Sequence, residues 1–446
     1  MTNEVTKMTS RIAAFVVDTN AREIPNTIYE HAKVALMDWL GVAIAGKEEP
    51  LVNKLIQYTD CLGGKEQATI LGHGVKKTVC QAALINGAAS HALDYDDSMI
   101  AFLGHPSVTL FPSILSLSEW QGKNGADFLT AYIIGLKAGT TVAKCAGMGH
   151  YGVGWHGTST MGHLASAAAC SRLLGLDVQQ TTYALGIAGT QASGLRQVFG
   201  TMCKPFHAGR ASEVGLMASL LAQNGFTSAE DILEGQVGLF KTMKGEVDKD
   251  VLDTLGKTWE IEGLAQKYHA SCHATHSPME AAMSIVKHHG LSIDEIKSIK
   301  IKASEMALSA AFRTEASTGL EGKFCIPYCV ANALVRGDTG TQAFQDNRVA
   351  DPEVRELMKK ISIRSYPEVQ AMEAEVDVEK ESGVIYSAFY DVIHEIPELE
   401  VKRSKIEKKF LDLCIPVLGD QKARQLVESL SGMEKINDMK SFVELM

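Results

Sequence analysis

The sequence predicts a mainly α protein, in which a large all-helical domain is interrupted by a smaller α+β domain. Two observations predict this organisation. From about residue 10 to residue 260, apolar residues recur at spacings of three and four, which is typical of amphipathic helices. Around residues 297–303 the spacing changes to the alternation of half-buried strands, and helical spacing returns from Arg403. We therefore expect residues 1–265 and 400–446 to form the helical domain and residues 266–399 to form the α+β domain.

Helix signals are dense in the first part of the chain. Asp177 is in the N-cap position of one predicted helix, and Thr227 with Glu230 forms a capping-box pair that predicts another. Small residues in Ala165–Cys170 and Ala188–Gly194 let helix backbones approach closely, so we expect tight packing. The clearest predicted helices are Pro25–Ala45, Lys76–Ala92, Pro112–Glu119, Gly125–Cys145, Met161–Leu174 and Gly209–Gln223.

Helices and strands are mixed in the inserted part. Asp351 followed by Pro352 marks a helix start, and Ser292 with Glu295 forms a second capping box. Helical spacing predicts helices over Met279–His288, Ile326–Val335 and Glu353–Lys360. Alternation predicts a strand around Ile299 and further strands over Ile361–Ser365, Glu373–Val378 and Val384–Tyr390, the last two forming a hairpin.

The composition excludes several classes of protein. The chain of 446 residues carries a formal net charge of -10, and because nucleic-acid binding requires a concentrated basic face, we expect no nucleic-acid partner. The apolar stretches end well short of the roughly 20 residues that span a membrane, and residues 1–17 do not resemble a signal peptide. The nine cysteines are odd in number and lack framework spacing. We therefore expect reduced thiols, no membrane contact and a cytoplasmic location.

Two segments of the helical domain place polar residues where the pattern expects apolar ones. The first runs from His91 to Ser98 and is followed by His105. Its three carboxylates in four positions favour an acid/base or metal site, or else the solvated end of a helix. In the second, residues 152–160, His156 lies among glycines just before a helix. A helix start attracts anions, although a plain glycine-rich loop has the same pattern, and a dinucleotide fingerprint is absent.

A third segment, residues 200–210, concentrates cations ahead of a helix. Lys204, His207 and Arg210 lie close together in a chain of negative net charge. A carboxylate partner explains this concentration, because cations and a helix start both favour an anion. A structural ion pair explains Arg210 equally well.

A fourth segment, residues 267–276, raises the question of a metal. His269, Cys272, His273 and His276 resemble a zinc-ligand set, but the sequence has no HExxH and no paired CxxC motif. Cys325 and Cys329 have no third cysteine nearby, which argues against an iron–sulfur cluster. The prediction is therefore that this segment binds no metal.

Taken together and in this order, the segments resemble the MmgE/PrpD family, which includes 2-methylcitrate dehydratase, cis-aconitate decarboxylase and iminodisuccinate epimerase. The resemblance covers about residues 10 to 440. It implies a helical domain built from both chain ends, an inserted α+β lid, a homodimer, and activity without metal or organic cofactor. The matching stretches are Ala89–Asp97 with His105–Pro106, Trp155–Thr158 leading into Gly162–Leu176, Gly200–Gly209, Lys267–His276 and Phe324–Tyr328.

The resemblance also implies a set of site residues that converge on a cleft between helical domain and lid. We expect His105 or His156 to be the general base, Asp94 to orient an imidazole, and Tyr328 or a second histidine to be the acid. Fixed cations stabilise the charge that develops beside a carboxylate. The residues expected to bind the substrate are Lys204, Lys267, Ser98, His273 and Cys272.

The fourth segment departs from the family's decarboxylase branch. That branch resembles Lys-Pro-Phe-Pro-Ala-His, whereas here the register runs from Lys267 to Cys272 and the histidine follows at His273. Ser98 also replaces a common threonine but keeps the hydroxyl group. The prediction is a cofactor-independent lyase that dehydrates or decarboxylates a small di- or tricarboxylic acid. The alternatives are a two-base epimerase of a dicarboxylic acid and, more remotely, a non-catalytic carboxylate-binding protein.

Overall fold

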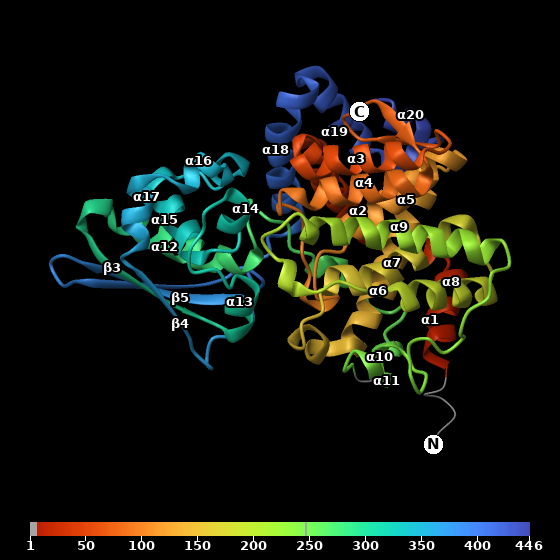
Figure 1. Cartoon of the computed structure of the whole chain (residues 1–446), viewed down its shortest axis with the longest axis horizontal. Coiled ribbons are helices and arrows are strands. Elements are labelled where there is room, and N and C mark those ends of the chain that lie inside the picture. Colours follow the sequence, from red (N-terminus) through yellow and green to blue (C-terminus); the bar gives the residue numbers. More distant parts are fainter. Residues whose placement is uncertain (1–6, 246–247) are drawn as a thin grey trace.

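The computed structural model describes residues 7–245 and 248–446 and consists of two bodies, a large helical one and a smaller one with a sheet (Figure 1). Each body has its own hydrophobic core. The predicted mainly α architecture with a smaller α+β region is confirmed. We call the bodies the helical domain and the α+β domain. In the part of the chain that the structure describes, no helix combines the length and apolar character needed to cross a membrane.

The helical domain begins with long helices that follow the predicted segments closely. The helix α6 is kinked at Gly147, where the backbone leaves the helical region with φ 62°. Two short helices, α10 (Leu239–Thr242) and α11 (Lys249–Leu252), complete this part. The long helices are α1 (Met8–Asp18), α2 (Asn26–Ala45), α3 (Pro50–Leu62), α4 (Val79–Ala92), α5 (Ser107–Gln121), α6 (Gly125–Gly152), α7 (Gly157–Leu174), α8 (Val178–Gln191) and α9 (Cys203–Gln223).

Small residues let these helices pack backbone to backbone, as the sequence predicted. At the crossing of α4 and α9, a Cβ atom added to Gly209 would lie 2.1 Å from the carbonyl oxygen of Leu84, so only glycine fits there. The helix α7 packs between α6 and α9 with a nearly continuous run of buried small side chains. This close packing brings the ends of α4, α7 and α9 together, and these ends carry three of the four polar segments.

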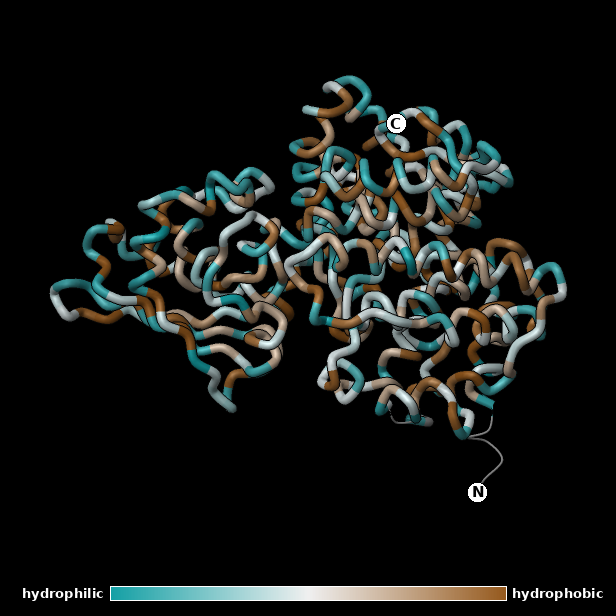
Figure 2. Tube along the Cα trace, in the orientation of Figure 1, coloured by the Kyte–Doolittle hydropathy of each residue, from teal (hydrophilic) through white to brown (hydrophobic). Residues whose placement is uncertain are grey.

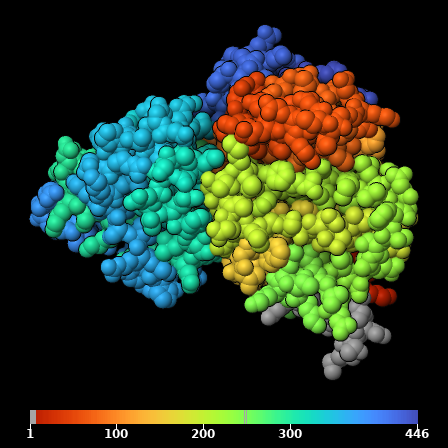
Figure 3. Space-filling model, in the orientation of Figure 1, coloured from red at the N-terminus to blue at the C-terminus, as the bar shows by residue number. Residues whose placement is uncertain are grey.

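The last helices of the chain return to the helical domain. They are α18 (Leu399–Leu418), α19 (Asp420–Ser431) and α20 (Met439–Val443), and their colours place them beside the N-terminal helices in Figure 3. Phe410 of α18 is buried against Gly41 of α2. A buried ion pair adds to this contact, with Lys409 Nζ 2.6 Å from Asp38 Oδ1. The helical domain is therefore built from both ends of the chain.

The α+β domain packs helices on one sheet whose strand order is β4–β3–β5–β6. The strands β3 and β4 are parallel, and the other neighbours are antiparallel. Buried Ile299 and Ile301 alternate with more exposed lysines along β3, as predicted. Figure 2 shows the tip of the β5–β6 hairpin, at the far left, as hydrophilic. The elements are α12 (His276–His289), β3 (Ile296–Ala303), α13 (Glu305–Ala310), α14 (Gly319–Gly322), α15 (Ile326–Arg336), α16 (Asp346–Val349), α17 (Pro352–Met358), β4 (Ile361–Ser365), β5 (Glu373–Lys380) and β6 (Ile385–Asp391).

Two local predictions were wrong. The helical domain is not entirely helical, because β1 (Ala68–Ile70) and β2 (Val75–Lys77) form a hairpin, and α4 begins only after the capping box of Thr78 and Gln81. The capping-box pair of Thr227 and Glu230 does not open a helix, since turns follow it. The strands of the hairpin are only three residues long, and the segment after Thr227 has no helical periodicity, so the structure of both depends on tertiary contacts.

Candidate active site

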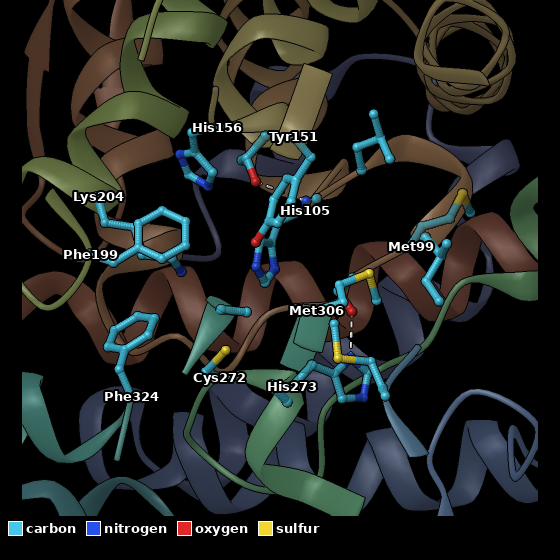
Figure 4. Close-up of a pocket in the computed structure, with 18 of the residues that line it drawn as sticks. Met99, His105, Tyr151, His156, Phe199, Lys204, Cys272, His273, Met306 and Phe324 are labelled. Atoms are coloured by element: carbon cyan, nitrogen blue, oxygen red, sulfur yellow. Dashed lines mark hydrogen bonds between the residues drawn. The ribbon is translucent and has the colours of Figure 1, made fainter. Parts of the chain in front are cut away.

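A cavity lies between the helical domain and the α+β domain, and most of the predicted site residues line it. Ser98, His105, His156 and Lys204 reach it from the helical domain. Cys272 and His273 reach it from the segment that leads into α12 (Figure 4). The four polar segments are thus brought together although they are far apart in sequence.

Asp94 lies just beyond the end of α4, where the chain turns sharply. Its φ of 50° is unusual for a residue other than glycine and indicates a conformation held by its contacts. Its carboxylate accepts a hydrogen bond from Lys267 at 2.5 Å and lies 3.1 Å from the ammonium group of Lys204. Burial alone would raise the pKa of Asp94, but the two lysines hold it well below its usual range. Asp94 therefore pairs with lysines, and the prediction that it orients an imidazole is wrong.

Lys267 lies behind the cavity wall rather than on it. Its side chain is completely buried, and besides the Asp94 carboxylate it donates to the Asp94 carbonyl oxygen at 2.9 Å. Burial disfavours the charged ammonium group, but Asp94 and Asp96 outweigh it and raise the pKa of Lys267. Lys267 thus fixes Asp94, and the prediction that it contacts the substrate directly is not supported by its position.

Asp96 takes the role that the sequence analysis gave to Asp94. It is fully buried, and its carboxylate lies 2.9 Å from His91 Nδ1 and 3.1 Å from His105 Nδ1. Burial would raise the pKa of Asp96, but the two imidazoles hold it well below its usual range. An ionised carboxylate between two rings favours the tautomers that carry the proton on Nδ1.

His105 has the arrangement of a general base. Its Nδ1 donates to the carbonyl oxygen of Asp97 at 2.7 Å, and since a carbonyl only accepts, the proton is on Nδ1 and the lone pair on Nε2. In the described part of the chain, no protein group bonds to that Nε2. Burial lowers the pKa of His105, so the imidazole is neutral at pH 7. Thr158 of α7 accepts from the His105 backbone N–H at 3.1 Å and fixes the loop.

Lys204, in the first turn of α9, is the cation of the cavity wall. Its ammonium group donates to His91 Nε2 at 3.0 Å, besides its ion pair with Asp94. The rings of Phe199 and Phe324 lie 5.7 and 5.3 Å from it, so it also makes cation–π contacts. Burial lowers the pKa of His91 to about 3, which keeps this ring neutral between Asp96 and Lys204.

His156 lies at the N-cap position of α7 and pairs with a second histidine. Its Nδ1 is 3.0 Å from Nδ1 of His207, so one of the rings donates to the other and both are neutral. Burial, with His207 beside it, holds the pKa of His156 well below its usual range. Burial also lowers the pKa of His207 to about 4.

His273 brings an imidazole from the α+β side. Its Nδ1 is hydrogen-bonded to the hydroxyl group of Ser98, whereas its buried Nε2 has no partner among the described residues. Burial holds the pKa of His273 well below its usual range. Its neighbour Cys272 also lines the cavity, and burial raises the pKa of that thiol. The fourth segment therefore supplies a neutral imidazole and a protonated thiol.

Tyr328 is not part of the site. It is fully buried in the core of the α+β domain, and its hydroxyl group donates to the carbonyl oxygen of Ala343. It lies on the buried face of α15. The residue of this segment that reaches the cavity is Phe324, which precedes the helix. The prediction that Tyr328 joins the other site residues at the cleft is wrong.

Among the residues that the structure describes, one group of side chains has the chemistry of a metal site. Donor atoms of His91, Asp94, Asp96 and His105 lie within 4.8 Å of one another. The carboxylate of Asp94 is already paired with two lysines, and both nitrogens of His91 have protein partners. An ion there would have to displace ammonium groups that already compensate the carboxylates. In the ligand-like set that the sequence suggested in residues 269–276, each of the three histidines has at least one ring nitrogen hydrogen-bonded to the protein.

Three residues of the site received no individual role in the sequence analysis: His91, Asp96 and His207. Each lies inside a segment that the analysis singled out, so the segments were found but not the residues that face inward. The signal for Asp96 was the run of three carboxylates in four positions. Which carboxylate faces the imidazoles depends on the turn at Asp94, which no periodicity specifies.

Comparisons with known proteins find matches along most of the chain. The MmgE/PrpD N-terminal domain matches residues 10–252, and the MmgE/PrpD C-terminal domain matches residues 269–432. A cis-aconitate decarboxylase of Aspergillus terreus is 25% identical over 476 residues, which cover 100% of this chain and 96% of the relative. The mouse cis-aconitate decarboxylase is 25% identical, over 97% of this chain and 91% of its own. A probable 2-methylcitrate dehydratase of Saccharomyces cerevisiae is 23% identical, over 80% of this chain and 73% of its own length.

Proposed function

Because this chain belongs to the MmgE/PrpD family, we propose that its cavity binds a small di- or tricarboxylic acid and removes a proton from the carbon beside a carboxylate group. The chain is a lyase of that family, like the decarboxylases and the dehydratase among its relatives. One observation carries the finer proposal. The neutral His105 presents a free Nε2 to a cavity that also contains the ammonium group of Lys204.

The first step follows from this pair. His105 Nε2 takes the proton from the substrate carbon, and the electron pair of the broken C–H bond moves toward the adjacent carboxylate. The carboxylate then carries the added charge as an enediolate, and a fixed cation in a desolvated site stabilises it. Lys204 is that cation, and Asp94 and Lys267 hold it in place from behind.

For the second step we propose His273 as the acid. If the hydroxyl group of Ser98 donates to Nδ1 of His273, the proton of this neutral ring is on Nε2, which lacks a protein partner among the described residues. As the C–O bond breaks, His273 gives its Nε2 proton to the departing hydroxide, and the proton that His105 removed returns to His273, so that both rings are neutral again. The products are an alkene and water. Cys272 stands where the decarboxylase branch has its histidine, which favours dehydration over decarboxylation.

An epimerase is the second candidate, and a specific observation favours it. His105 and His273 come from the two different domains and line one cavity, each with a nitrogen that has no partner in the described part of the chain. Two bases on opposite sides of one carbon are what proton-transfer epimerisation requires. The same residues therefore support either reaction, and the fate of the neighbouring bond decides between them.

Nuclear magnetic resonance in D2O separates these reactions. Citrate, 2-methylcitrate, cis-aconitate and dicarboxylic acids with an α-amino or α-hydroxy group are incubated with the protein, with Lys204→Met as the matched control. A new vinylic signal indicates dehydration, loss of one carboxyl carbon indicates decarboxylation, and deuterium uptake without other change indicates epimerisation. If none of the acids exchanges a proton or changes its carbon skeleton, the proposal is contradicted.

Three further features come from the family and are part of the proposal: a homodimer, a cytoplasmic location and activity without a metal. For the metal, the prediction is that dialysis against a chelator leaves turnover unchanged, because lysines already compensate the carboxylates of the site. Activity that is lost on dialysis and restored by zinc or iron would contradict it. Light scattering across a range of concentrations tests the dimer, and a constant monomer mass would contradict it.

A further inference from the structure

The cavity between the two domains has its cation at one end, and His273 lies beside Met306 away from that end (Figure 4). His105, His156 and Lys204 lie together at that end, and Figure 4 shows Met99 and Met306 on the side away from Lys204. Most of the remaining wall is apolar and comes from both domains. The residues of this apolar wall are Met99, Leu103, Met148, Met306, Met372 and Ile393.

The end of the cavity at Lys204 has little uncompensated positive charge. Of the described residues that line the cavity, Lys204 is the single lysine or arginine. It pairs with Asp94, which is also paired with Lys267, and Asp96 is held ionised between neutral imidazoles. Two lysines and two carboxylates therefore compensate each other. Burying three further carboxylates here would be costly, because buried charges are tolerated only when they are paired.

The apolar wall continues to the surface of the molecule. Ile100 and Met148 line the cavity and are 37% and 46% exposed, so hydrophobic surface stands open to water at its mouth. Because these two side chains both line the cavity and reach the solvent, they can contact an apolar group that extends out of it. Methionine suits a flexible group of variable shape, because its unbranched thioether side chain adapts to what it contacts.

We infer that the natural substrate is a dicarboxylic acid that carries an unbranched alkyl substituent of several carbon atoms. This inference rests on the proposed function, since it takes one carboxylate to lie at Lys204 and the reacting carbon at His105. The alkyl group then passes between Met99 and Met306 toward the exposed Ile100 and Met148. Residues of both domains thus form the apolar wall that selects the substrate, whereas His105 and Lys204 of the helical domain act on the reacting carbon and its carboxylate.

Binding of substituted succinates tests the inference without requiring turnover. Calorimetry measures the affinity of succinate, methylsuccinate, butylsuccinate and octylsuccinate for the full-length protein. We expect the affinity to rise by about fourfold for each methylene group that becomes buried. Met306→Gln and Met372→Gln should reduce this gain. Met358→Gln, a half-buried methionine of α17 that is not on the cavity wall, should leave it unchanged.

The outcomes separate the inference from the function on which it rests. Dimethyl butylsuccinate has the alkyl group but no charge, so it should bind far more weakly than butylsuccinate. If succinate binds and the alkyl group adds nothing, this inference is overturned and the proposed function stands. If no succinate binds, this inference is overturned, and the exchange experiment in D2O with the other acids decides on the proposed function. An equal gain in Met306→Gln, Met372→Gln and the unchanged protein would overturn the assignment to this wall.

Discussion

The two walls of the cavity are built in opposite ways. On the helical-domain side, Asp94, Asp96, His91, His105, Lys204 and Lys267 form a network in which nearly every charge has a buried partner. On the α+β side, the contacts are mainly apolar, and the main polar contribution is His273, which bonds to Ser98 of the helical domain. Close-packed helices can hold a desolvated network rigidly, whereas a separate domain can vary its lining without disturbing that network.

The largest effect should come from breaking the network at its centre. Asp94→Asn leaves the buried ammonium groups of Lys204 and Lys267 without their shared carboxylate. Removing one partner of a buried ion pair costs about 3–5 kcal/mol, so we expect a loss of unfolding free energy of that size. Urea denaturation followed by circular dichroism measures it.

The matched control is Asp60→Asn, because Asp60 pairs with Lys77 at an exposed site. Exposed pairs contribute about 0–1 kcal/mol, so this variant should be nearly as stable as the unchanged protein. If the two variants lose the same free energy of unfolding, this would contradict the claim that the buried network contributes more to stability than an exposed ion pair.

The next largest effect should come from lowering the pH, which should reduce the free energy of unfolding of the helical domain. Burial lowers the pKa of His91 to about 3, below the roughly 6.5 of an unfolded chain. The unfolded chain therefore binds more protons as the pH falls, so this stability is present above about pH 6.5 and is lost between pH 6.5 and 3. Linkage gives a loss of roughly 2 kcal/mol for His91 between pH 7 and pH 5. Unfolding free energies that stay constant over this range would contradict the neutral-imidazole account.

On the α+β side, His273→Gln should slow turnover by about 10²-fold, the lower end of the range for a proton-transfer group. The substrate should still bind, because Lys204 and the apolar wall are unchanged, so KM should change less than kcat. Steady-state kinetics on the acid identified by magnetic resonance measures both. A variant that raises KM and leaves kcat unchanged would assign His273 to binding alone.

The smallest effect should come from the residue beside it. Burial raises the pKa of the Cys272 thiol, so it is protonated at neutral pH and a poor nucleophile. We expect Cys272→Ser to turn over at close to the normal rate, and iodoacetamide to react slowly with this thiol. Abolished turnover in Cys272→Ser would show that the thiol takes part in the reaction.

Much of this fold could be predicted from periodicity. The strand Ile361–Ser365 and the helix α2 lie where the sequence pattern placed them, to within a residue. Periodicity reports which face of an element is buried, and it succeeds where that face packs on a large core. It failed at the Ala68–Lys77 hairpin, whose short strands have too few residues for a pattern.

The sequence predicted which segments form the site, but it predicted less well which residues of each segment face the cavity. His105, His156 and Lys204 line the cavity as expected, because each lies next to a helix start that packing brings there. Asp94 and Asp96 differ in role because the chain turns between α4 and His105, and this turn is set by contacts distant in sequence. Tyr328 was misplaced because a buried tyrosine looks the same in a sequence whether it faces a cleft or a core.

The central claim is that His105 removes a proton from carbon beside a carboxylate, and deuterium exchange in His105→Gln tests it most directly. The control is His289→Gln, which changes a histidine stacked on Tyr386 outside the cavity. We expect exchange on the active carboxylic acid to slow by about 10²–10⁴-fold in His105→Gln and to be unchanged in His289→Gln. Exchange at the normal rate in a folded His105→Gln protein would contradict the account.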